Sequence, residues 1–274
     1  MNNKTIAIMY DFDKTLCTKD MQEYTFIPSL GIKPGEFWKE ANDLREYDKM
    51  DAVLTYMYLM RQKMLDQGMP LNREYLTKIG RNIELFPGVE EWFKRINEYG
   101  KEKGMTIEHY IISSGLVEII EGSSIGKYFK CIFASEFFYD DDHNAIWPKR
   151  AINYTNKTQY LIRINKGVLD VADDVNVNKK VAEDSKKIPM SNMIYIGDGI
   201  TDVPCMKLTK EGGGVSIAVY TERNIETAKG LKEDERINYA TEADYRPDSR
   251  IDIIVKKTID AMAINSELKE LSKK

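Results

Sequence analysis

The chain has 274 residues, of which 42% are hydrophobic and 31% charged, so it can form one large α/β domain with a smaller insert, or two modest domains. Its net charge of −4 argues against a general nucleic-acid-binding protein, because neutralising phosphates needs a clustered excess of basic residues. Three cysteines (Cys17, Cys131 and Cys205) and two histidines (His109 and His143) lack the spacing of metal-binding pairs. Neither a structural zinc site nor a disulfide framework is therefore expected.

The N-terminal segment leads into a short apolar run, residues 6–10, that stops at Asp11. A signal peptide needs a longer apolar stretch and a small-residue cleavage site. No run in the sequence approaches the ~18 apolar residues of a membrane span. We therefore expect a cytoplasmic protein without a membrane partner, and nothing in the sequence indicates its oligomeric state.

The first predicted element is a buried strand at residues 5–10, which are nearly all apolar. The following stretch, residues 17–85, has few strand signals, and its apolar residues recur at helical spacing. Glycine and proline at 31–35 and 68–70 divide it into separate helices. This pattern predicts an all-helical insert.

Strands and helices alternate again beyond this insert. A hairpin with an Asp/Asn-rich turn is predicted at 136–148, and the charged stretch 170–187 is expected to be a solvated helix or loop. The other predicted elements are helices at 89–103, 116–122, from Lys157 and near 202–210, and strands at 107–112, 131–134, 192–196 and 215–219. Such alternation predicts an α/β fold, a parallel Rossmann-like sheet with helices on both faces.

Acidic and polar residues follow the predicted strands at the point where each strand ends. Asp11 and Asp13 follow the first strand, residues 113–115 (Ser-Ser-Gly) follow the second, and Asp198 and Asp202 follow the strand at 192–196. The carboxyl ends of parallel strands meet at one edge of a sheet, where ligands bind. Carboxylates this close repel one another unless a cation lies among them, and hard oxygen ligands suit Mg²⁺.

Phosphoryl transfer uses the groups that this cluster offers. One carboxylate can attack phosphorus, and a second, held partly protonated by its neighbours, can protonate the leaving alkoxide and later deprotonate water. A magnesium ion would stabilise the developing charge. Hydroxyl, backbone N–H and lysine groups would hold the phosphate oxygens.

The order of these motifs resembles the haloacid dehalogenase (HAD)-like hydrolase superfamily. The shared pattern is Asp-x-Asp-x-Thr, then Ser-x-Gly, a lysine that opens a helix, and Gly-Asp-Gly-x-Thr-Asp. The resemblance covers essentially the whole chain and implies a core domain of residues 1–16 and 86–274 with a helical cap domain of residues 17–85. The hairpin at 136–148 is similar to that of the phosphoserine phosphatase-like branch.

The resemblance implies a role for each matching residue. Asp11 matches the nucleophile, and Asp13 matches the general acid and base. Asp11, the backbone carbonyl of Asp13, and Asp198 match the Mg²⁺ ligands, and Asp202 matches the carboxylate that braces the metal site. Ser113 matches the phosphate-binding hydroxyl.

The rest of the expected phosphate site also comes from the resemblance. Ser114 and Gly115 are expected to bind phosphate together with Ser113. Lys157 opens a predicted helix, as the lysine of the family does. The roughly 40 residues between Lys157 and Asp198 are, however, a longer separation than the family usually has. Lys166 is the alternative.

Three residues match substrate-recognition positions of phosphoserine phosphatases: Asp20, Glu23 close by, and Arg61 on a cap helix. The resemblance implies a small phosphorylated metabolite as substrate, with phosphoserine one candidate. Two alternatives stay open: a phosphotransferase or mutase of the same superfamily, and a non-catalytic binding protein on the same fold. Asp13 favours phosphate ester chemistry over dehalogenation, because a halide leaves without a proton.

Overall fold

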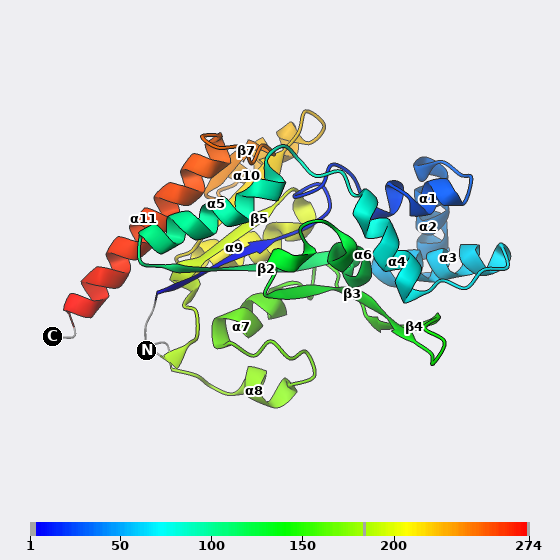
Figure 1. Cartoon of the computed structure of the whole chain (residues 1–274), viewed down its shortest axis with the longest axis horizontal. Coiled ribbons are helices and arrows are strands. Elements are labelled where there is room, and N and C mark those ends of the chain that lie inside the picture. The colour runs from blue at the N-terminus through cyan, green and yellow to red at the C-terminus, as the bar shows by residue number, and fades with distance from the viewer. Residues whose placement is uncertain (1–3, 183–184, 273–274) are drawn as a thin grey trace.

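The computed structural model describes residues 4–182 and 185–272, and a seven-stranded sheet lies at its centre (Figure 1). The strands follow the order β4-β3-β2-β1-β5-β6-β7. Neighbouring strands are parallel except for the pair β3–β4, which is antiparallel. The strands are β1 (Thr5–Tyr10), β2 (Thr106–Leu116), β3 (Cys131–Tyr139), β4 (Ala145–Arg150), β5 (Met193–Gly197), β6 (Val215–Tyr220) and β7 (Tyr239–Glu242). The predicted α/β class and largely parallel sheet are confirmed.

Helices surround this sheet and also form the insert between β1 and β2. The α-helices are α1 (Phe26–Ser29), α2 (Pro34–Asp48), α3 (Ala52–Asp66), α4 (Arg73–Ile79), α5 (Val89–Glu102), α6 (Val117–Gly122), α7 (Thr158–Lys166), α8 (Asp174–Asn178), α9 (Val203–Glu211), α10 (Ile225–Glu233) and α11 (Arg250–Leu271). The 3-10 turns are η1 (Met21–Glu23), η2 (Gly80–Asn82), η3 (Gly126–Tyr128), η5 (Met190–Asn192) and η6 (Ile200–Asp202).

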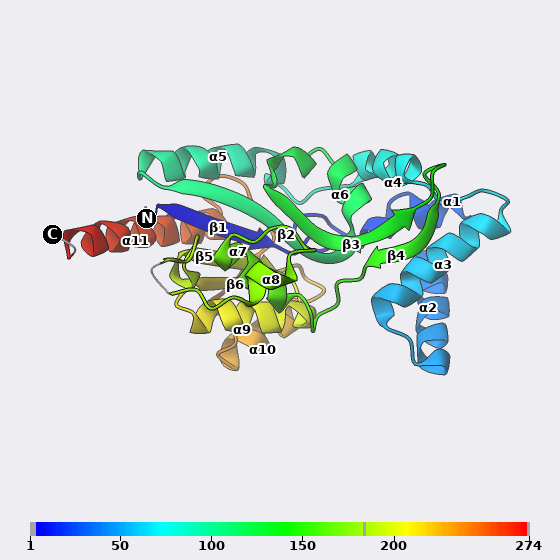
Figure 2. The same ribbon diagram turned by 90° about the horizontal axis from the view of Figure 1, so that it is seen from below.

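Two hydrophobic layers pack the helices against the sheet, because successive side chains of a strand point to opposite faces. Ile6 and Ile8 of β1 lie in a cluster with α5 and α11, whereas Ala7 and Met9 lie in a cluster with α7, α9 and α10. Figure 2 shows α5 on one side of the sheet and α9 with α10 on the other. β1 is therefore buried on both faces, as its continuous apolar sequence predicts.

The insert is helical, as predicted, and α1, α2 and α3 project beyond one end of the sheet (Figures 1 and 2). The last helix of the insert, α4, instead packs against α6, which follows β2. A Cβ atom on Gly122 would lie 1.8 Å from the carbonyl oxygen of Thr77, and one on Gly80 would lie 2.1 Å from that of Ile119. Glycine at both positions lets these backbones approach closely. The final turns of the insert are thus joined tightly to the sheet-bearing part.

Some elements differ from those predicted. β2 continues to Leu116, and its pairing with β3 shifts between Ile112 and Leu116, so the polar residues expected beyond the strand lie within its irregular end. The stretch 170–187 contains α8 and is mostly exposed, with residues 183–184 outside the described part. Beyond β6 the structure adds α10, β7 and α11, which were not predicted. None of the described helices combines the length and the apolar character of a transmembrane segment.

Candidate active site

Asp11 lies in the loop after β1, at the point where the strand order reverses. β1 pairs with β2 on one side and β5 on the other, and open α/β sheets bind their ligands at such a switch point. The backbone N–H of Asp11 donates to the carbonyl of Ile196 on β5 at 3.0 Å. The N–H of Phe12 donates to Oδ1 of Asp11 at 2.7 Å. These bonds fix the Asp11 side chain, which is only 7% exposed.

Asp13 follows two residues later and is half-buried. Its Oδ1 accepts a hydrogen bond from the backbone N–H of Met21 at 2.9 Å and lies 3.6 Å from the thiol of Cys17. Burial, followed by the charges of Asp20 and Asp11, raises the pKa of Asp13 well above its usual value. A raised pKa favours the protonated carboxyl, which is the form that can act as an acid.

Lys14 and Asp20 form an ion pair at the mouth of the same loop. Nζ of Lys14 lies 2.6 Å from Oδ2 of Asp20, and both side chains are accessible to solvent. The backbone of Lys14 adopts the left-handed conformation, with φ of 57°. The carboxylate of Asp20, predicted as a substrate-recognition residue, is therefore already paired with the ammonium group of Lys14.

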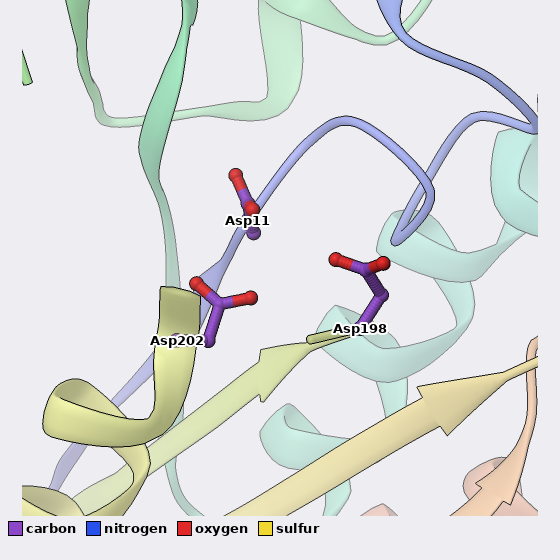
Figure 3. A group of neighbouring side chains, drawn as sticks. All are labelled: Asp11, Asp198 and Asp202. Carbon is purple, nitrogen blue, oxygen red and sulfur yellow. The ribbon is translucent and has the colours of Figure 1, made fainter. Parts of the chain in front are cut away.

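The loop after β5 brings two further carboxylates towards Asp11. Asp198 follows the strand directly, and Asp202 precedes α9. One carboxylate oxygen from each of Asp11, Asp198 and Asp202 lies within 4.8 Å of the others. Figure 3 shows the three side chains gathered where β1 and β5 end. The side-chain amide of Asn224 donates to the backbone carbonyl of Asp198 at 3.0 Å and holds this loop in place.

The electrostatics of these carboxylates fit a divalent cation. Burial, followed by the charges of Asp202 and Asp11, raises the pKa of Asp198 to about 8, and burial raises that of Asp202 to about 6 although Lys157 opposes the change. Oδ2 of Asp202 is buried and has no hydrogen-bond partner among the described residues. Unpartnered oxygen in a crowded acidic cluster suits Mg²⁺, which prefers oxygen ligands.

Lys157 lies immediately before α7 and is completely buried. Its Nζ is 3.0 Å from Oδ2 of Asp11 and 2.8 Å from Oδ1 of Asp202. Burial disfavours its charge, but the two carboxylates outweigh that effect and raise the pKa of Lys157. Lys166, the alternative lysine, instead donates to the backbone carbonyls of Val177 (2.6 Å) and Lys179 (2.8 Å). The structure therefore places Lys157 beside Asp11 and Lys166 elsewhere.

Ser113 and Ser114 line the same cavity as Asp11, Asp13 and Asp198. Oγ of the buried Ser113 accepts a hydrogen bond from the N–H of Gly115 at 3.1 Å. A Cβ atom on Gly115 would lie 2.0 Å from Cε of Met21 and 3.2 Å from Oδ2 of Asp13, so a larger residue there would have to displace the end of the buried Met21 side chain. Ser114 uses its carbonyl to accept from the hydroxyl of Tyr56 at 2.6 Å, which ties α3 to this segment.

A cavity of about 430 Å³ opens onto Asp11, Asp13 and Asp198, whereas Lys157, Asp202 and Gly115 are not part of its lining. It is lined by Asp11, Asp13, Lys14, Asp20, Ser113, Ser114, Asp198, Gly199, Ile200, Thr201, Asn224 and Thr227. Sequence reasoning missed Lys14, Thr201 and Asn224. Asn224 follows β6 at the same edge of the sheet, so the rule that found Asp198 could also have found Asn224.

Two of the predicted specificity residues lie outside this cavity's lining. Oε1 of Glu23 accepts a hydrogen bond from the indole N–H of Trp38 at 2.7 Å. Nε of Arg61 donates to the carbonyl of Ala145 on β4 at 2.9 Å. In the described structure Glu23 orients an aromatic side chain, and Arg61 joins α3 to the β3–β4 hairpin.

Several solved structures share this fold. A HAD family hydrolase from Salmonella enterica serovar Typhi is 16% identical, with 92% of this chain and 70% of that chain covered and a TM-score of 0.59. A phosphoserine phosphatase with a phospho-aspartyl intermediate analogue is 14% identical, with 93% and 99% covered and a TM-score of 0.56. A cytosolic 5′-nucleotidase IIIB bound to cytidine is 15% identical, with 98% and 88% covered and a TM-score of 0.51.

A sequence relative and a family model extend the comparison. An uncharacterized protein from Borreliella burgdorferi is 28% identical over 90% of this chain and 93% of its own length. The model of the haloacid dehalogenase-like hydrolase family matches residues 8–207, a range that includes both aspartate loops and Lys157. The chain therefore belongs to the haloacid dehalogenase-like hydrolase family.

Proposed function

We propose that the protein is a Mg²⁺-dependent phosphatase that hydrolyses a small phosphomonoester through an aspartyl-phosphate intermediate on Asp11. Membership of a hydrolase family supports the reaction class. The observation that carries the proposal is the surroundings of Asp11, with Nζ of Lys157 at 3.0 Å and oxygens of Asp198 and Asp202 within 4.8 Å. Such a cluster suits an anionic substrate when a divalent cation balances the carboxylates.

Asp11 and Asp13 would divide the reaction into two steps. A carboxylate oxygen of Asp11 attacks phosphorus, the bond from phosphorus to the ester oxygen breaks, and protonated Asp13 gives its proton to the departing alkoxide. Asp13 then takes a proton from water, whose oxygen attacks phosphorus and releases inorganic phosphate and free Asp11. The raised pKa of Asp13 supports its role as the acid in the first step and as the base in the second.

The carboxylates of Asp11 and Asp198, together with the backbone carbonyl of Asp13, would hold Mg²⁺, and Asp202 would brace the site. The ion would supply charge that screens the nucleophile from a dianionic ester. Asp202 also holds Lys157, through the 2.8 Å contact to its Oδ1. This arrangement leaves the lysine beside Asp11, where a phosphate oxygen would arrive.

Ser113, Ser114 and Gly115 would bind the phosphate opposite Asp11, with Lys157 supplying the positive charge. Two observations support this role: Ser113 and Ser114 line the cavity, and a Cβ atom on Gly115 would crowd the side chains of Met21 and Asp13. Hydroxyl and N–H groups of this kind bind equatorial phosphate oxygens.

We also propose residues 17–85 as a cap domain over a core of residues 1–16 and 86–274. The cap would exclude water and select the leaving group of a small phosphorylated metabolite, with phosphoserine one candidate. We expect neither nucleic acid nor a membrane as partner, and a cytoplasmic location. Exchanging residues 17–85 for the cap of a relative should change the preferred substrate; an unchanged preference would contradict this role.

The decisive experiment measures phosphate release from a panel of phosphorylated metabolites, with Mg²⁺ and with chelator. Turnover should need Mg²⁺ and disappear in Asp11→Asn. Labelled phosphate from the ester should be trapped on Asp11 after acid quenching. Transfer of the label to a second alcohol without free phosphate would instead indicate a phosphotransferase or mutase, and binding without any labelling would indicate a non-catalytic protein.

A further inference from the structure

A second cavity of about 250 Å³ lies beside the proposed phosphate site, between the cap and the core. Its walls come from α2 and α3 of the cap and from the segment that precedes α7. Ser114 and Thr201 line both cavities, so the two spaces adjoin. The adjoining space is where the non-phosphate part of an ester would extend.

Aromatic rings whose polar groups are already bonded form the inner wall of this cavity. The indole N–H of Trp38 donates to Glu23 at 2.7 Å, and the hydroxyl of Tyr56 donates to the carbonyl of Ser114 at 2.6 Å. The two rings meet edge to face with centroids 6.3 Å apart. Their orientations are fixed before any ligand binds, which lowers the entropic cost of binding. Their remaining surface is apolar.

The outer rim carries an exposed ring and a cation. Tyr154 is 55% exposed and lines the cavity from the core side. Arg45 lines it from α2, and within residues 4–182 and 185–272 no ion pair or side-chain hydrogen bond joins the Arg45 guanidinium to another residue. A guanidinium in this state has all its donors available for a ligand.

We propose that this second cavity binds the leaving group of the substrate, and that this group is an aromatic ring with an oxygen acceptor near Arg45. The inference rests on the proposed phosphatase function. Aromatic walls favour stacking or edge contacts with a planar ring. The volume lies just below the roughly 300–1,000 Å³ of pockets for drug-sized ligands, so it suits one or two rings. A serine-sized leaving group would leave the aromatic surface unfilled.

The test compares esters of primary alcohols, so that the leaving-group chemistry is matched. Benzyl phosphate carries a bare ring, pyridoxal 5′-phosphate carries a ring with oxygen acceptors, and glycerol 3-phosphate and phosphoserine carry no ring. Wild-type protein with Mg²⁺ should show a kcat/KM at least about tenfold higher for the two ring-bearing esters, the scale of a good apolar contact in a specificity pocket.

Variants of the cavity separate its parts. Tyr154→Ala, at a partly exposed side chain, and Trp38→Leu should each lower kcat/KM for the ring-bearing esters about tenfold and leave glycerol 3-phosphate within about twofold. Arg45→Gln should affect pyridoxal 5′-phosphate more than benzyl phosphate. Two variants serve as matched controls: Trp147→Ala, at an aromatic side chain 71% exposed on the hairpin, and Arg81→Gln on η2. Neither should change kcat/KM for the ring-bearing or the ring-free esters.

A binding measurement keeps the inference independent of turnover. Calorimetry of Asp11→Asn with intact pyridoxal 5′-phosphate should show weaker binding when Tyr154→Ala is added, whereas glycerol 3-phosphate should bind equally to both. Equal losses for ring-bearing and ring-free esters in every variant would overturn the aromatic pocket while leaving the phosphatase intact. No hydrolysis of any ester by wild-type protein would overturn the proposed function instead.

Discussion

Nζ of Lys157 lies 2.8 Å from Oδ1 of Asp202, and the same nitrogen lies 3.0 Å from Oδ2 of Asp11. One buried ammonium group thus links the loops that follow β1 and β5. Breaking a buried ion pair by removing one partner is costly, because the other charge stays buried without compensation. The position of Asp11 therefore depends on the residue that precedes α7 as well as on its own loop.

Replacing Lys157 by methionine should lower the free energy of unfolding by about 3–5 kcal/mol in chelator. Urea denaturation measures the loss. Lys166→Met is the matched control and should cost less than about 1 kcal/mol, since Lys166 bonds only neutral backbone carbonyls at the surface, one part-buried and one exposed, and leaves no buried charge behind. Adding Asp202→Asn to Lys157→Met should recover part of the stability; a double variant no more stable than the single one would contradict this account.

Removal of Mg²⁺ should make stability depend on pH. The pKa of Asp198 is about 8 in the folded chain and about 3.9 in an unfolded one, so the folded state holds the extra proton. Stability without metal should accordingly fall as pH rises from about 4 to 8. Magnesium replaces the proton, so its effect on Tm should be small at pH 5 and reach about 3 °C or more at pH 8.

Asp198→Asn provides the control for this pH dependence. The variant carries no charge at this position, so it should be more stable than the wild type at pH 8 in chelator and gain little from Mg²⁺. Differential scanning calorimetry at both pH values measures the two effects. An equal Mg²⁺ gain in variant and wild type would show that the ion binds elsewhere.

Asp11→Asn should lower kcat by about 10⁴-fold or more, because no nucleophile remains. The cavity should keep its shape, so the variant should still bind ester. Stopped assays of phosphate release measure the loss, and circular dichroism checks the fold. Substantial remaining turnover would contradict a covalent route through Asp11.

Asp13→Asn should lower kcat by about 10²–10⁴-fold for alkyl phosphates. The loss should be smaller for formation of the phosphoenzyme from 4-nitrophenyl phosphate, whose leaving group needs no proton. Rapid-quench measurements should then show a burst of nitrophenol followed by slow turnover, because the water-activating base is absent. Equal losses for both classes of ester in the first step would argue against Asp13 as the acid.

Sequence reasoning placed Asp11 and Asp198 at one edge because the carboxyl ends of parallel strands must meet there, whatever the rest of the chain does. The same reasoning had no means of orienting side chains on the helices between β1 and β2. Arg45 lies on α2 and Arg61 on α3, and only the packing of these helices decides that Arg45 lines a cavity while Arg61 bonds to Ala145. Local sequence patterns therefore predict which residues follow a strand better than they predict which helical side chains will line a cavity.

The junction between the insert and the sheet-bearing part gives a final prediction, on stability. Gly122→Ala would place Cβ 1.8 Å from the carbonyl oxygen of Thr77, and a backbone atom cannot rotate away. The variant should lose about 1–3 kcal/mol, the usual cost of overpacking. Gly230→Ala in α10 is the matched control, because its Cβ would meet nothing within 4 Å, and it should gain about 0.5–1 kcal/mol. A urea midpoint that rises for Gly122→Ala, as it should for Gly230→Ala, would show that α4 and α6 are not closely packed.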